Sequence, residues 1–233
     1  RLGSLGEIRH LEFEAKTGAG TLVLPHELPR PLEFERIKFA GDVRNALDTV
    51  NITEAKIDFG QPQLELSVFA SRLGENFRAH LDAEVSGLQM SKLAQYWPEK
   101  LGSSAHAWVT SNIRGGQLER GDLALILDVP IASPTEPQIR SMSGSLKYEN
   151  LVVDYFNPFP KATGVGGSAT FTLDRLDLSV ARGKVLDLDL DHGVINMTRL
   201  DTEAEKIAID LVLRGPLSTA LVLANREPFG LVG

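Results

Sequence analysis

The chain has 233 residues, of which 42% are hydrophobic and 24% charged, so it can form one large β unit or two ordinary domains. A net charge of −7 disfavours electrostatic binding to nucleic acid or to an anionic membrane surface, and 6% aromatic residues offer few platforms for base stacking. The absence of cysteine excludes disulfides, thiolate metal sites and cysteine nucleophiles. We therefore expect no nucleic-acid partner.

The first third of the chain predicts β-strands. Apolar and polar residues alternate there with period 2, which is typical of a strand with one apolar face. Turn signals such as Gly60-Gln61-Pro62 and Leu73-Gly74-Glu75-Asn76 separate neighbouring stretches, as in antiparallel hairpins. The strands are expected around residues 11–13, 37–39, 57–59, 64–70 and 77–85.

Two short helices are predicted next. Ser91 can cap a turn or two that holds Leu93, Tyr96 and Trp97, and Pro98 stops it. Ser103 or Ser104 can cap a second segment, with Ala105, Trp108 and Val109 on one side and Gly115-Gly116 at its end.

The second half returns to alternation after a strand at residues 123–129. Prolines at 130, 134 and 137 predict a Pro-rich loop over 130–139, which divides the chain into segments 1–129 and 140–233. Turns are expected at Arg182-Gly183 and His192-Gly193, and a third helix after Gly215-Pro216. The strands of this half are expected around residues 146–148, 169–173, 176–180, 186–190 and 207–213.

Together these elements predict a mainly β fold, a long antiparallel meander sheet with about three short helices. Roughly a dozen strands create one long apolar face, which three short helices cannot cover. The face must therefore pack on a second sheet, close into a barrel, or remain an open or partly closed groove that holds something apolar. Alternation alone leaves these choices open.

Two stretches of the sequence resemble a known family. The first runs from Tyr96-Trp97-Pro98 through Ala107-Trp108-Val109 to the turn at Gly115-Gly116, and the second from Leu213-Arg214-Gly215-Pro216 to Pro228-Phe229-Gly230. Both are similar to the YhdP-like domain of the AsmA-like proteins, in which such motifs interrupt the strands. The motifs are structural, and none of them is catalytic.

The resemblance implies a fragment of a large bacterial envelope protein. Such a protein is anchored in the inner membrane by an N-terminal helix, and its periplasmic β-groove holds or conducts phospholipid between the inner and outer membranes. It implies a non-catalytic role in lipid transport and outer membrane biogenesis, with phospholipid or another acyl-chain lipid as the partner and other envelope proteins as further partners.

The residues expected to line such a groove are selected only from the period-2 alternation of apolar residues in the predicted strands. Trp97 and Trp108 are expected to pack the two helices onto the end of the sheet, or else to form a cap over the groove. The candidate lining residues are Leu64, Leu66, Val68, Phe77, Leu81, Leu123, Leu125, Leu127, Phe171, Leu173, Leu178, Leu188, Ile209 and Leu211.

Other chemistry finds little support in the sequence. Asp187, Asp189 and Asp191 could face a cation, but the leucines between them make these carboxylates the solvent face of a strand whose charges are relieved by cross-strand partners. Nothing positions a carboxylate pair for glycoside hydrolysis or a Ser-His-Asp triad. We expect no metal, no cofactor and no enzyme activity. The alternative function is a closed β-sandwich that acts as an envelope scaffold or assembly factor and binds protein partners through its strand edges.

Overall fold

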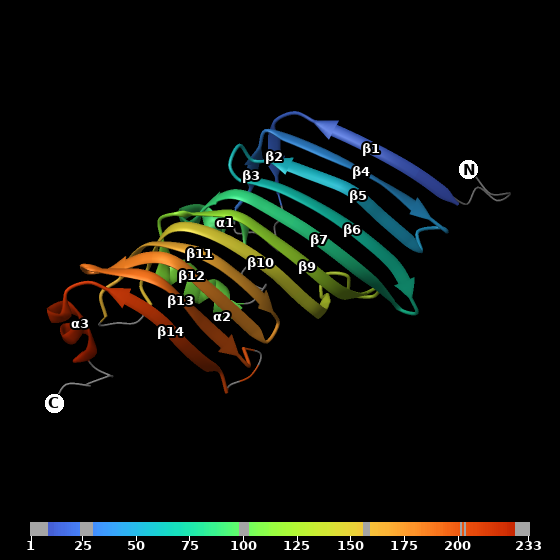
Figure 1. Cartoon of the computed structure of the whole chain (residues 1–233). Coiled ribbons are helices and arrows are strands. Elements are labelled where there is room, and N and C mark those ends of the chain that lie inside the picture. Colours follow the sequence, from blue (N-terminus) through green and yellow to red (C-terminus); the bar gives the residue numbers. More distant parts are fainter. Residues whose placement is uncertain are drawn as a thin grey trace. The chain divides into compact units, whose positions relative to one another are not determined.

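The computed structural model describes residues 9–23, 30–97, 103–155, 159–200, 202 and 204–226. Strands dominate them (Figure 1), as the alternation predicts. The strands are β1 (His10–Thr17), β2 (Gly20–Leu22), β3 (Leu32–Phe34), β4 (Arg36–Arg44), β5 (Thr49–Asp58), β6 (Gln63–Leu73), β7 (Asn76–Gln89), β8 (Ile113–Arg114), β9 (Gln117–Pro130), β10 (Gln138–Val153), β11 (Ala162–Thr172), β12 (Arg175–Val185), β13 (Leu188–Thr198) and β14 (Lys206–Arg214).

Most of these strands belong to one antiparallel meander. Hydrogen bonds link twelve strands in the order β1-β4-β5-β6-β7-β9-β10-β11-β12-β13-β14, with β8 paired to β10, and β2 pairs only with β3. This order confirms the predicted long antiparallel sheet. The closed sandwich is wrong for the described residues, because the order is open at β1 and β14 and the only other sheet among them has two strands.

The three predicted helical segments are confirmed. The first is a 3₁₀ turn, η1 (Met90–Lys92), that continues into α1 (Leu93–Tyr96). The others are α2 (Ser103–Asn112) and α3 (Leu217–Ala224). Ser91 does not cap the first segment, since Gln89 occupies the N-cap position and no side chain bonds there. Pro98, which was expected to stop the first helix, and Pro228, in the second stretch that resembles the YhdP-like domain, lie outside the described residues. None of the described helices is long and apolar enough to cross a bilayer.

Two predicted turns lie instead inside long strands. Arg182-Gly183 lies within β12 and His192-Gly193 within β13, beside a register shift between Leu190 and His192. The reversal between β12 and β13 falls at Leu186, whose φ is +56°. Glycine in a strand can mark a bulge as well as a turn, and a register shift lies near each of these glycines, between Val180 and Arg182 on β12 and between Leu190 and His192 on β13.

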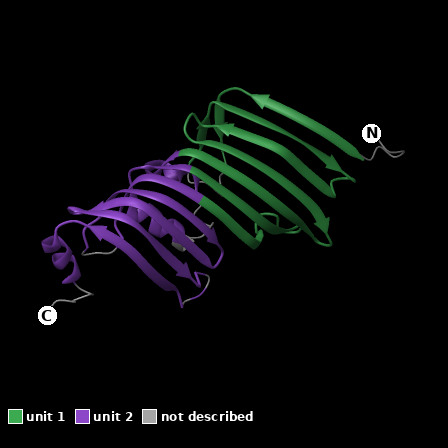
Figure 2. Ribbon diagram, in the orientation of Figure 1, with its two compact units in different colours: residues 1–25, 30–87, 120–145 green, residues 26–29, 88–119, 146–233 purple. Residues whose placement is uncertain are grey.

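The chain forms two compact units (Figure 2). Unit 1 comprises residues 1–25, 30–87 and 120–145, and unit 2 comprises residues 26–29, 88–119 and 146–233. Among the described residues, three of the fifteen buried hydrophobic side chains lie in unit 1 and twelve in unit 2. The division of the chain into segments 1–129 and 140–233 at the loop 130–139 stays a prediction.

Unit 2 contains a packed core. Leu188 is 2% exposed at its centre, and Leu223 from α3 packs into the same cluster. Met90 from η1 and Phe159, which precedes β11, pack against it. Helical and loop residues therefore cover the apolar side of these strands.

Candidate functional site

The strongest candidate site is the apolar face of unit 1. Strands β1, β4, β5, β6 and β7 form antiparallel pairs there, with one irregularity at β5, and directly opposed residues share a face. Following these pairs from strand to strand gives four apolar rows across the sheet. The rows are Ile37-Ile57-Leu64-Val85, Ala15-Phe39-Ala55-Leu66-Ala83, Phe13-Gly41-Ile52-Val68-Leu81 and Leu11-Val43-Val50-Ala70-Ala79.

A β-bulge keeps the rows aligned. The register shifts between Ala40 and Gly41 on β4, opposite Thr53 of β5, and Thr53 Oγ1 donates a hydrogen bond to the carbonyl of Ala40 at 3.2 Å. The extra residue lets Ile52 and Ala55, which have different parity in sequence, point to the same face. A cross-strand Phe13 ring lies over Gly41, since a Cβ there would be 2.8 Å from Phe13 Cζ. The aromatic ring fills the gap that the glycine leaves.

These rows are only partly covered. Ala79 is buried, but Leu11 is 48% and Phe39 39% exposed, and most of the other row residues are half-buried. Four rows about 6.7 Å apart across five strands about 4.8 Å apart give a field of roughly 400 Å². This area is comparable with the largest apolar patch of an ordinary monomer, and such a patch is often a functional surface.

Strand β9 extends the same face. Arg120 of β9 pairs with Glu84 of β7 at 2.8 Å, and Arg78 of β7 pairs with Asp128 of β9 at 2.9 Å. Both pairs lie on the polar side of their strands. The odd-numbered Leu123, Leu125 and Leu127 therefore point to the apolar side, as Leu81 does.

The structure thus brings together eight of the candidate lining residues in unit 1. Leu125 is 8% exposed, and the other seven are half-buried. The eight are Leu64, Leu66, Val68, Phe77, Leu81, Leu123, Leu125 and Leu127. The sequence reasoning missed Phe13, Phe39 and Ile52 on the same face. Phe13 and Phe39 follow the same period-2 alternation as the other residues of this face, so the sequence could have identified them. Ile52 breaks that alternation because of the bulge at Thr53, so its face could not be predicted from the sequence.

The six candidates in unit 2 have a different setting. Leu188 is in the core, Leu178 and Leu211 pack against it, and Phe171 is half-buried. Leu173 lies in the connection after β11 and is 39% exposed, because the strand ends at Thr172. Ile209 on the edge strand β14 is 63% exposed. These residues do not form one surface comparable with that of unit 1.

The two tryptophans differ in burial. Trp97 is half-buried, and its ring meets the His106 ring of α2 edge-on with centroids 5.4 Å apart. This contact joins the end of α1 to α2. Trp108 is 43% exposed, so it contributes less packing than Trp97.

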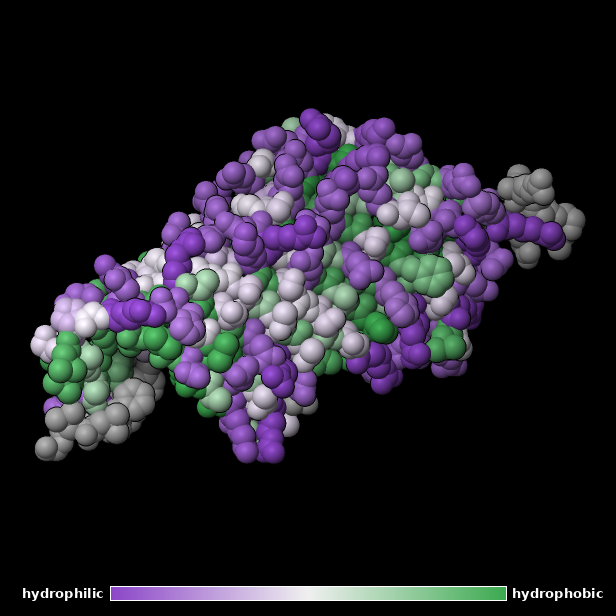
Figure 3. Space-filling view, viewed as in Figure 1, coloured by the Kyte–Doolittle hydropathy of each residue, from purple (hydrophilic) through white to green (hydrophobic). Residues whose placement is uncertain are grey.

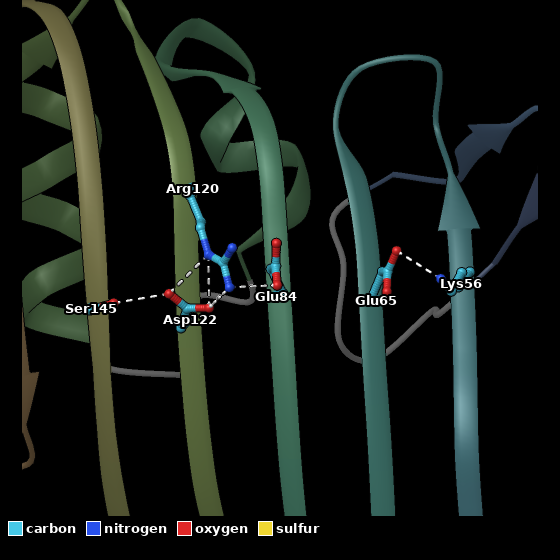
Figure 4. Close-up of polar contacts among 6 residues, drawn as sticks. All are labelled: Lys56, Glu65, Glu84, Arg120, Asp122 and Ser145. Carbon is cyan, nitrogen blue, oxygen red and sulfur yellow. Dashed lines mark hydrogen bonds and ion pairs between the residues drawn. The ribbon is translucent and has the colours of Figure 1, made fainter.

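The opposite face of unit 1 is polar and laced with ion pairs. Lys56 bonds to Glu65 at 3.1 Å, and Arg120 contacts both Glu84 and Asp122, which in turn accepts a bond from Ser145 at 3.0 Å (Figure 4). A shallow hollow lies over these strands, and the lining residues that point into it are mostly charged or small and polar. Figure 3 shows hydrophilic side chains spread over the strands of unit 1, with hydrophobic groups between them.

Ion pairing sets the protonation of this polar face. Hydrogen bonds from Lys38 and then Lys56 lower the pKa of Glu54. Hydrogen bonds from Arg78 and then Arg140 lower the pKa of Asp128 to about 2. Every Asp or Glu with a resolved shift is shifted in this direction among the described residues. A general acid would need the opposite shift, so this face is suited to solvation and strand pairing.

The aspartates of β13 have cross-strand partners, as predicted. Asp189 pairs with Lys184 of β12 at 3.3 Å, and Asp191 pairs with Arg214 of β14 at 3.0 Å. Asp187 lies in the connection before β13. Among the residues with described positions, no group of three or more His, Asp or Glu side chains could hold a metal ion.

Comparison with protein families gave one match. The model of the family described as YhdP protein matches residues 5–230, nearly the whole chain. Comparisons with curated proteins and with solved structures returned no match. The match confirms the resemblance seen around Trp97 and Gly215-Pro216, and this chain belongs to the YhdP family.

Proposed function

We propose that the chain is a non-catalytic, periplasmic segment of a membrane-anchored envelope protein, and that the apolar face of unit 1 holds phospholipid acyl chains. Membership of the YhdP family, a bacterial envelope family related to lipid transport, supports this role. The observation that carries it is the set of four apolar rows, which cross the strands of unit 1 and are only half-buried.

The energetics suit a mobile lipid. Covering an apolar surface contributes about 0.8 kcal/mol per buried methylene, so a whole acyl chain, with its many methylenes, supplies ample driving force for binding. Most of the row residues are aliphatic, and β6 presents Leu64, Leu66 and Val68 to successive rows. Neighbouring positions then offer similar binding energy, and an acyl chain can shift along the face towards the next segment of the parent protein.

A charge on the apolar face tests the proposal. Val68→Asp places a carboxylate in the third row, where it would have to be desolvated beneath an acyl chain. Leu125 and Leu211 are less suitable, because the first is buried and the second packs on the unit 2 core. The matched control is Phe69→Asp, the next residue of β6, which lies on the polar face and is 48% exposed.

The measurement is the amount of phospholipid extracted from the purified chain, quantified by mass spectrometry. Val68→Asp should reduce co-purified phospholipid at least several-fold, whereas Phe69→Asp should retain the wild-type amount. Circular dichroism and thermal unfolding verify that both variants are folded. Equal lipid content in a folded Val68→Asp variant and in the wild type would overturn the proposal.

A further inference from the structure

Among the residues with described positions, the cation that stands on the apolar face of unit 1 is Arg72. The apolar residues of β6 on this face are Leu64, Leu66, Val68 and Ala70, and the next position on the same face is Arg72. The register from Gln63 to Leu73 is unbroken, so Arg72 is directly opposite Phe77 of β7. The arginine therefore ends the apolar column at the β6–β7 turn.

The guanidinium of Arg72 is weakly held. Its Nε donates to the carbonyl of Gly74 at 3.3 Å, and its Nη1 donates to Asp48 Oδ1 at 3.4 Å. Both bonds are longer than the usual 2.9–3.0 Å for N–H···O contacts. Its Nη2 makes no hydrogen bond to any described residue, and the side chain is 54% exposed. Donors therefore remain available to a further acceptor.

An exposed apolar residue lies in the connection that contacts Arg72. Leu47, beside Asp48 in the β4–β5 connection, is 62% exposed. Leu73 alternates to the polar face of β6. Two carboxylates, Asp48 and Glu75, lie in the β4–β5 and β6–β7 connections and limit the local positive charge. An apolar column that ends in one available guanidinium complements an amphiphile with an acyl chain and one anionic head group.

We propose that Arg72 binds the phosphate group of a phospholipid whose acyl chain lies on the apolar face of unit 1, an inference that rests on the proposed function. Guanidinium pairs with phosphate through two parallel N–H···O bonds, and Arg72 has such donors available. The head group is then held at the β6–β7 turn, and the acyl chain runs from Phe77 towards Leu64 and Val85. This gives the bound lipid one orientation.

The test compares two lipids with identical acyl chains, phosphatidylglycerol and diacylglycerol, which lacks the phosphate. The purified chain is loaded with each lipid, and the retained amount is measured. Arg72→Gln should lower retention of phosphatidylglycerol about threefold, because one partly exposed charge interaction is lost, and should leave diacylglycerol unchanged. Arg120→Gln is the matched control, since it removes one positive charge from the polar face of the same unit.

The outcomes separate this inference from the proposed function. If the wild type retains neither lipid, both proposals fail. If Arg72→Gln retains phosphatidylglycerol as the wild type does, or loses both lipids equally, only the head-group assignment fails. Arg72→Lys, which keeps the charge but not the planar fork, should retain an intermediate amount. Inorganic phosphate at millimolar concentration should not release the lipid, and release would indicate a site for free phosphate.

Discussion

Units 1 and 2 use the same alternation of apolar and polar residues but cover the apolar side differently. In unit 2, Leu223 of α3, Met90 and Phe159 pack onto the strands around Leu188. In unit 1, the rows through Leu66 and Val68 remain only half-buried. Period-2 alternation thus defines which side of a sheet is apolar. Whether that side becomes a core or a binding surface depends on the segments packed against it.

The largest contrast should appear in core truncations. Leu188→Ala removes a side chain that is 2% exposed, and we expect it to lower the free energy of unfolding by about 2–5 kcal/mol. Leu66→Ala, on the half-buried face of unit 1, should cost less than about 1.5 kcal/mol. Urea unfolding measures both. Equal losses would show that unit 1 has a core as well packed as that of unit 2.

Glycine substitutions sharpen the contrast in packing. A Cβ on Gly167 of β11 would meet the Ser179 carbonyl and would be 3.0 Å from Tyr148 Oη. We expect Gly167→Ala to lower the free energy of unfolding by about 1–3 kcal/mol. Gly18→Ala in unit 1 is the control, because a Cβ at Gly18 would meet nothing within 4 Å and its φ lies outside the left-handed region. Equal stability of the two variants would argue against the close strand approach at Gly167.

Acidification should weaken the ion pairs that Asp128 forms with Arg78 and Arg140 in unit 1. Arg78 and Arg140 lower the pKa of Asp128 to about 2, so its stabilising contribution is complete above the ordinary carboxyl pKa of about 4. The contribution is lost as the pH falls from about 4 to about 2. Urea unfolding across this range should show a smaller loss of stability for Asp128→Asn than for the wild type. An unchanged pH dependence in this variant would contradict the assignment.

The smallest effect is expected on the polar face. Lys56 pairs with Glu54 and Glu65, but all three side chains are at least one-third exposed. Exposed pairs contribute little to stability, so Lys56→Ala should leave the unfolding midpoint within experimental error. A clear fall in the midpoint would indicate that the ion pairs of this face stabilise unit 1 beyond simple strand solvation.

Much of the fold could be predicted from the sequence. Strongly alternating stretches such as Leu64–Ala70 are strands, and the segments before Gly115 and after Pro216 are helices. The short strands β2, β3 and β8 escaped prediction because two or three residues carry no period. The beginning of β10 was missed as well, since Ser141, Ser143 and Ser145 alternate with few apolar residues.

The site was less accessible to sequence reasoning. Leu178 and Leu188 have the same period as Leu66, and only tertiary packing shows that they belong to a core. Thr53 inserts one extra residue, which hides the position of Ile52 in the third row. Arg72 comes after the apolar residues Leu64 to Ala70 of β6 but is itself charged, so the alternation of apolar residues gave no reason to select it. Its place on the apolar face emerges only from the register with β7.

The central claim is that acyl chains contact the apolar face of unit 1, and photo-crosslinking tests it most directly. A benzophenone side chain in place of Val68 reports on that face, and the same group in place of Phe69 reports on the polar face one residue away. After irradiation of the lipid-loaded chain, mass spectrometry should find phospholipid adducts at position 68 and few at position 69. Adducts of equal abundance at both positions, or at neither, would contradict the claim.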